Sequence, residues 1–116
     1  RLELSHAERI GALRGYFETH GCPEGIICLH DEIMILVYRA LRDCGYKIPE
    51  DVLLVGCDGI PLIECFDPPL SAIRHPLEEA TKLAWQFLRT RIESPHIPLQ
   101  QTTRKAKLVM RESMQP

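Results

Sequence analysis

The chain has 116 residues, 45% of them hydrophobic, with a formal net charge of −2 and a pI near 6.2. This length allows one domain at most, and the apolar content is enough for a packed core, which excludes a disordered chain. The small acidic excess excludes a general electrostatic attraction to nucleic acid, so any contact with DNA must be made by another segment.

The cysteines and the hydropathy indicate a cellular location. An odd number of cysteines without a CxxC pair is typical of a reduced, cytoplasmic protein, and these are Cys22, Cys28, Cys44, Cys57 and Cys65. No apolar run approaches the roughly 18 residues that cross a bilayer, so no membrane partner is expected. The chain begins without methionine, and we therefore expect it to be a piece of a longer protein.

The N-terminal part predicts a helix followed by a strand. Ser5 and Glu8 have the spacing of a capping box, and apolar residues at helical spacing continue to the Gly21 region, so the helix should span about residues 6–20. The continuous apolar run 26–29 predicts a buried strand. Asp31 follows it, where it can cap the next helix.

The middle of the chain predicts a second helix and a second strand. Residues 32–43 carry apolar side chains around much of a helix that ends near Gly45. The run 52–55 does not alternate, as expected for a strand covered on both faces, and residues 56–59 should stop it. Two successive strand and helix passages imply right-handed crossovers and a mainly parallel sheet.

The C-terminal half begins irregularly. Prolines should forbid a continuous element over 61–69, and the apolar side chains there need a cover, for which a partner surface is one candidate. An extended piece at 71–74, a helix over 76–92 and a strand over 106–110 should follow. The fold class is therefore α/β, a three-layer α/β/α lobe.

Asp58, His30 and His75 are the candidate ligand-binding residues. Asp58 follows a buried strand, where ligands bind in parallel sheets, and its two acceptor oxygens suit vicinal hydroxyls or a base N–H. Capping of the local backbone is an equally good interpretation of Asp58, and for His30 hydrogen bonding to the backbone is the favoured interpretation. Pro76 restricts His75 to an extended backbone, which would aim its ring at a defined place. No spacing supports a metal site, and no base adjoins Cys57, so neither a metal nor an enzyme is expected.

The order of residues from Gly25 onward resembles the effector-binding core of LacI/GalR-family transcriptional regulators, which have a type I periplasmic-binding-protein-like fold. The motifs that carry the resemblance are His30-Asp31, Ala40-Leu41 with Gly45, Pro49-Glu50-Asp51-Val52, Gly56-Cys57-Asp58-Gly59, Pro68-Pro69-Leu70-Ser71, His75-Pro76 and 108–113. The chain departs from the family pattern at His30, Cys57, Gly59 and His75, whereas Asp58 matches.

The resemblance implies a single partial domain over residues 1–116, the C-terminal subdomain of a sugar- or effector-binding core without its DNA-binding headpiece. Its function would be ligand sensing and dimerisation, with a small sugar-like or nucleoside-like effector, no cofactor, and DNA bound only through a headpiece. A homodimer surface is expected at Tyr38, Ile63, Cys65 and Phe66. A solute-binding protein of the same fold is the alternative, followed by a small enzyme or a structural pairing module.

Overall fold

A computed structural model describes residues 4–115 of the protein. These residues divide into two units, which are described separately. Unit 1 contains residues 4–74 and 108–115, and unit 2 contains residues 75–107. Among the described residues, no helix is both long and apolar enough to cross a membrane.

Helix α1, His6–His20, begins and ends as its sequence predicts. The hydroxyl of Ser5 accepts a hydrogen bond from the Glu8 amide at 3.3 Å, and the Ser5 amide donates to the Glu8 carboxylate at 2.7 Å. The Ser5 amide, and the Ser5 hydroxyl, which also donates to this carboxylate at 2.8 Å, lower the pKa of Glu8. The helix ends at Gly21, whose φ of 80° is open to glycine but strained for other residues. The predicted capping box is therefore confirmed.

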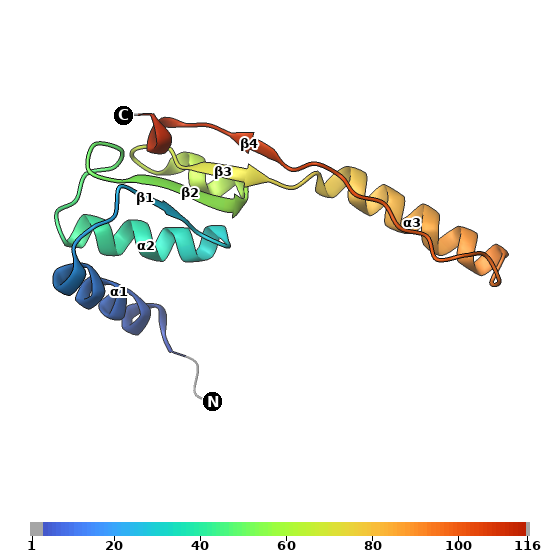
Figure 1. The fold of residues 1–116 in the computed structure, drawn as a ribbon, viewed down its shortest axis with the longest axis horizontal. Coiled ribbons are helices and arrows are strands. Elements are labelled where there is room, and N and C mark those ends of the chain that lie inside the picture. The colour runs from blue at the N-terminus through green and yellow to red at the C-terminus, as the bar shows by residue number, and fades with distance from the viewer. Residues whose placement is uncertain (1–3, 116) are drawn as a thin grey trace. The chain divides into compact units, whose positions relative to one another are not determined.

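Four strands form one sheet in the order β1-β2-β3-β4, with β1 at Gly25–Ile27, β2 at Leu53–Asp58, β3 at Ser71–Arg74 and β4 at Lys107–Val109. The pairs β1–β2 and β2–β3 are parallel. Helix α2, Asp31–Asp43, connects β1 to β2 and packs on one face of the sheet, and α1 packs on α2 (Figure 1). The predicted α/β class with a mainly parallel sheet is confirmed.

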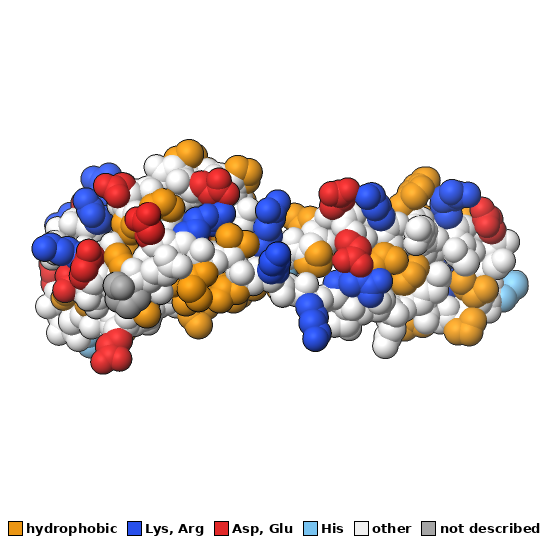
Figure 2. Space-filling model, turned by 90° about the horizontal axis from the view of Figure 1, so that it is seen from above, with side chains coloured by type: hydrophobic (Ala, Val, Ile, Leu, Met, Phe, Trp, Pro, Cys, Tyr) orange, Lys and Arg blue, Asp and Glu red, His pale blue; other side chains and the backbone are white. Residues whose placement is uncertain are grey.

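Two strand predictions need correction. Strand β2 does not stop at Gly56 but runs on to Asp58, because β3 pairs with it from Val55 to Asp58. The predicted strand 26–29 is shorter and less buried than expected, since β1 ends at Ile27, which is 75% exposed, and Leu29 beyond it is 71% exposed. No part of residues 4–115 covers these two side chains fully. Figure 2, which views the molecule of Figure 1 from above, shows hydrophobic side chains gathered on the surface of this unit.

The core of unit 1 lies between α1, α2 and the sheet. Glycine at position 56 is part of this packing, because a Cβ there would lie 2.8 Å from Met34 Cε. The region predicted to be irregular contains a 3-10 helix, η1 at Pro61–Cys65, with proline in its first turn. Buried hydrophobic residues that share this core include Phe17, Met34, Val37, Ala40, Leu41, Leu54, Ile63, Leu70 and Ala72.

The C-terminal residues of unit 1 are held on the sheet by the hydrogen bonds of two buried serines. The short helix η2, Glu112–Met114, places the Ser113 hydroxyl where it accepts from the Ser71 amide at 2.8 Å and donates to the Leu54 carbonyl at 2.6 Å. The Arg111 guanidinium also donates to Glu64 of η1 at 2.7 Å. The last residues of the chain thus bind to both β2 and η1.

Unit 2 consists of helix α3, Leu77–Glu93, and the segment that follows it. Pro76 is the N-cap rather than the first helical residue. The Arg91 guanidinium donates to the Ile97 carbonyl at 2.6 Å, and Arg104 pairs with Glu79 at 2.6 Å. No residue of α3 is buried, and its exposed apolar side chains are Leu77, Trp85, Leu88 and Ile92.

Candidate functional site

The carboxyl ends of β1, β2 and β3 meet at one edge of the sheet, which is where parallel sheets bind ligands. Asp58 ends β2, Arg74 ends β3, and these two residues are partners in the strand register. His30 follows β1, with its Nδ1 3.6 Å from Asp58 Oδ2. The structure therefore brings His30 and Asp58 together, and it places Arg74 on the neighbouring strand.

Asp58 has an unusual backbone conformation for a residue with a side chain. Its φ is 121°, and it is the one non-glycine residue with positive φ among residues 4–115. Such a conformation costs about 1–3 kcal/mol and persists only where the surrounding structure imposes it. The carboxylate is 40% exposed and accepts a long bond of 3.4 Å from the Asp31 amide. Asp58 thus retains acceptor capacity toward solvent or a ligand.

Asp31 holds the turn that follows Asp58. Its side chain is almost fully buried, and Oδ2 accepts from the amides of Gly59 and Ile60, each at 2.7 Å. The expectation that Asp31 caps α2 is wrong, because the N-cap is His30, whose side chain makes no capping hydrogen bond. The carboxylate instead binds a turn 28 residues further along the chain. Only the pairing of α2 with the end of β2 could have revealed this role.

Gly56 allows Asp31 to reach that turn. A Cβ at position 56 would collide with Asp31 Oδ1 and crowd Met34. Oδ1 has no hydrogen-bond partner within residues 4–115, since it lies against this glycine backbone. The absence of a side chain at Gly56 therefore sets the depth at which the buried carboxylate sits.

Arg74 is a second residue that the sequence did not point to. A Cβ added to Gly59 would lie 3.0 to 3.4 Å from Cγ, Cβ and Cδ of Arg74, so the stem of this arginine lies over the glycine. Within the described chain the guanidinium has no ion pair or hydrogen bond. Its only sequence signal is its position as the last residue of an extended piece beside a predicted site.

His75 belongs to unit 2. Its carbonyl accepts a hydrogen bond from the Leu77 amide at 2.9 Å, and its side chain is exposed. A role for His75 in ligand binding stays a prediction.

The residues expected at a dimer surface have different environments. The Tyr38 hydroxyl donates to the Asp67 carbonyl at 2.8 Å, and its ring meets Phe66 edge-to-face at 4.9 Å between centroids. Cys65 is exposed. Ile63, however, is fully buried in the core of its own unit, so its side chain does not lie on the expected surface. Tyr38, Cys65 and Phe66 remain candidates.

The thiols near the site differ in accessibility. Burial, with smaller contributions from Cys57 and Asp31, raises the pKa of Cys28 to about 11, which keeps this thiol neutral and unreactive. Cys57 is half-buried on β2. Residues 4–115 contain no group of three histidine, cysteine, aspartate or glutamate side chains that could hold a metal ion.

Comparison with known proteins identifies relatives of this chain. The ribose operon repressor of Haemophilus influenzae is 35% identical over 92 residues, which are 79% of this chain and 28% of that protein. The HTH-type transcriptional repressor PurR of Vibrio vulnificus is 30% identical over the same shares. The chain thus spans less than a third of the length of these curated relatives, which are named as repressors and not as enzymes.

Solved structures agree with these relatives. A LacI family transcriptional regulator from Arthrobacter sp. FB24, in complex with lactose, has a TM-score of 0.84 and 32% identity, covering 97% of this chain and 42% of that one. A LacI family regulator from Enterococcus faecium with bound ribose has a TM-score of 0.80 and 25% identity, covering 97% and 41%. Residues 3–114 also match the family described as periplasmic binding protein-like domain. The chain therefore belongs to the periplasmic binding protein-like domain family, in the form found in LacI-family transcriptional regulators.

Proposed function

We propose that this chain is the ligand-sensing and dimerisation part of a LacI/GalR-like transcriptional regulator that binds a small sugar-like or nucleoside-like effector. Asp58 is the observation that carries the proposal. It combines a strained backbone, an exposed carboxylate and a position at the meeting ends of three parallel strands. The names of the relatives favour a regulator over a solute-binding protein.

The chemistry of the site suits a polyol. The two oxygens of Asp58 can accept hydrogen bonds from neighbouring hydroxyls, and a hydrogen bond to an ionised carboxylate is worth about 1.5–3 kcal/mol. His30, 3.6 Å from Asp58, can donate to or accept from the same ligand, depending on its tautomer. His75 is kept as a proposed ligand contact on the strength of its sequence position alone.

The proposed mechanism is a shift of populations. A ligand held between two lobes favours one lobe orientation, which alters the spacing of DNA-binding headpieces in the complete protein. In this mechanism the chain needs no catalytic residue, contacts DNA only through a headpiece, and acts in the cytoplasm.

Dimerisation is proposed at the surface formed by Tyr38, Cys65 and Phe66. Sedimentation equilibrium of the complete gene product tests it. We expect Cys65→Glu to shift the protein toward the monomer, because a charge would enter an apolar contact. Glu18→Gln, on the exposed side of α1, is the control and should leave the mass unchanged. A wild-type protein that is monomeric at high concentration would contradict this part of the proposal.

Ligand binding is tested by calorimetry of the complete gene product with pentoses, hexoses and purines. We expect Asp58→Ala to weaken binding at least about tenfold, since one charge-assisted hydrogen bond is worth that much. Asp43→Ala, which removes a carboxylate paired with Arg39 on α2, should leave the affinity unchanged. If Asp58→Ala binds as tightly as the wild type, Asp58 is not the ligand-binding residue.

A further inference from the structure

We infer that the effector carries a negatively charged group and that Arg74 binds it. This inference rests on the proposed ligand site and names the chemical class of its ligand, a polyol with one anionic substituent such as a sugar phosphate or a sugar acid. Arg74 would then determine specificity beside Asp58. Three features of the strand ends support this assignment.

The first feature is the placement of Arg74. It is the register partner of Asp58 on the adjacent parallel strand, so its backbone lies beside the residue that ends β2. Its stem lies over Gly59, with the nearest ideal Cβ distances from that glycine at 3.0 and 3.1 Å. A side chain at position 59 would displace this stem. The glycine thus directs the arginine along the turn that follows Asp58.

The second feature is that the guanidinium is free. No ion pair or hydrogen bond of Arg74 is found within residues 4–115, although the carboxylate of Asp58 lies on the next strand. By contrast, Arg111 in the same unit binds both Glu64 and the Leu70 carbonyl. Guanidinium groups bind phosphate and carboxylate with two parallel hydrogen bonds, and all the donors of Arg74 are available for this.

The third feature is that the backbone donors of the turn are already used. The amides of Gly59 and Ile60 donate to the buried Asp31 carboxylate, and the Asp31 amide points at Asp58. These amides cannot form an anion-binding nest for a ligand. In the described part of unit 1 the positive charge at this edge therefore comes from Arg74.

The charges together define the ligand class. A neutral polyol would satisfy Asp58 but leave Arg74 unpaired, and a ligand with only acidic groups would be repelled by Asp58. A molecule with hydroxyls at one end and an anionic group at the other satisfies both. We therefore expect an anionic sugar derivative to bind more tightly than its neutral parent.

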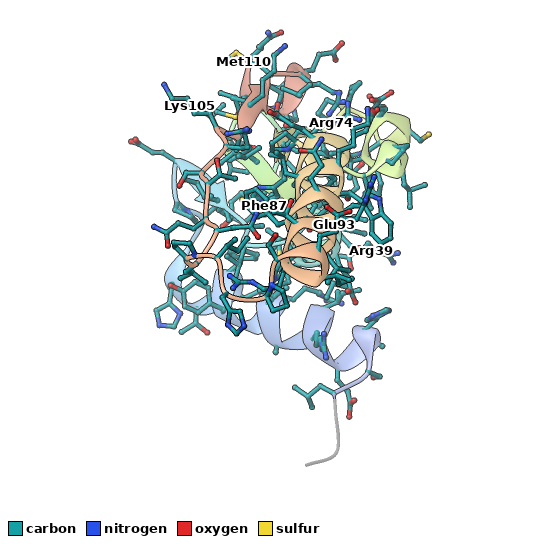
Figure 3. The ribbon with its side chains drawn as sticks, turned by 90° about the vertical axis from the view of Figure 1, so that its right-hand side faces the viewer. Arg39, Arg74, Phe87, Glu93, Lys105 and Met110 are labelled. Atoms are coloured by element: carbon teal, nitrogen blue, oxygen red, sulfur yellow. The ribbon has the colours of Figure 1, made fainter. Side chains whose placement is uncertain are left out.

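Calorimetry of the complete gene product tests this with matched probes: ribose against ribose 5-phosphate, and glucose against glucose 6-phosphate and glucuronate. The variants are Arg74→Gln, which keeps most of the stem, Arg74→Lys, and Arg39→Gln as an exposed arginine control. Arg39 lies well apart from Arg74 in Figure 3. We expect an anionic probe to bind at least about tenfold more tightly than its parent.

The expected pattern is specific to Arg74. Arg74→Gln should abolish the margin between the anionic probe and its parent, Arg74→Lys should keep part of it, and Arg39→Gln should keep all of it. The phosphate and carboxylate probes show which anionic group is recognised. If a neutral sugar binds in an Asp58-dependent way and neither its anionic derivative nor Arg74→Gln changes the affinity, this inference is overturned while the proposed function stands. If no sugar probe binds but a purine does, this inference is overturned while the proposed function stands, and if neither sugars nor purines bind, both are overturned.

Discussion

Replacement of Asp31 should unfold the candidate site as well as weaken the fold. In Asp31→Ala the amides of Gly59 and Ile60 both lose their bond to a buried carboxylate, and each such bond is worth about 1.5–3 kcal/mol. Since these amides are only partly buried, water replaces some of this bonding, and we expect a loss of about 2–3 kcal/mol in the free energy of unfolding. Asp31→Asn keeps a neutral acceptor but places an amide NH₂ against Met34 and Gly56, so it should recover only part of the loss.

Urea unfolding at pH 7 measures the change in stability, and amide hydrogen exchange locates it. Both variants should speed exchange at Gly59 and Ile60 more than in the core of the sheet. Glu32→Gln is the matched control, because Glu32 is the next residue of α2 and its carboxylate is exposed. A loss below about 0.5 kcal/mol in Asp31→Ala, with exchange at Gly59 unchanged, would refute the assigned role.

Four further substitutions test the packing of unit 1. Gly56→Ala should lower the free energy of unfolding by about 1–3 kcal/mol, because the new methyl group meets α2 side chains at under 3 Å. Gly11→Ala, at an exposed position of α1, should raise it by about 0.5–1 kcal/mol. Thermal unfolding compares the two variants. Ser113→Ala should lower the free energy of unfolding, measured with urea, by about 1–3 kcal/mol, since the buried Ser71 amide loses its acceptor. A loss near zero would mean that the hydrogen bonds of Ser113 do not stabilise the fold. For Cys28, whose thiol pKa is raised from 9.0 to about 11, the neutral form belongs to the folded state, so its contribution to stability is complete below pH 9 and is lost as the pH rises through 11. Unfolding series across this pH window should therefore decline less steeply for Cys28→Ala than for the wild type.

The sequence predicts elements well where local chemistry decides them. The capping box at Ser5 and the glycine at position 21 define α1 without any tertiary information. The lack of alternation over 52–55 correctly places β2 inside the sheet. The same pattern misleads at Ile27 and Leu29, because a continuous apolar run does not reveal whether other residues of the same chain cover both faces of the strand.

The candidate site shows the same division. Asp58 can be placed from its strand and from the turn residues that surround it, and its strand does end there. Asp31 and Arg74 cannot, because their roles depend on which side chain lies over which glycine in three dimensions. Ile63 shows the converse error, since the apolar side chain that suggested a partner surface fills the core of its own unit.

The backbone strain at Asp58 and the hydrogen bonds that Asp31 accepts from the next two residues are energetically coupled. A positive φ at a residue with a Cβ costs about 1–3 kcal/mol, similar to the bonds that hold the next two residues, so the turn imposes the strain that aims the carboxylate. Asp58→Ala retains this strain and Asp58→Gly relieves it, although glycine also loses more conformational entropy on folding. We expect Asp58→Gly to be about 1 kcal/mol more stable than Asp58→Ala in urea unfolding, while both lose ligand affinity. Equal stabilities would mean that the strain at Asp58 is no larger than the entropy cost of glycine, roughly 0.5–1 kcal/mol, and that the carboxylate is placed mainly by its own contacts.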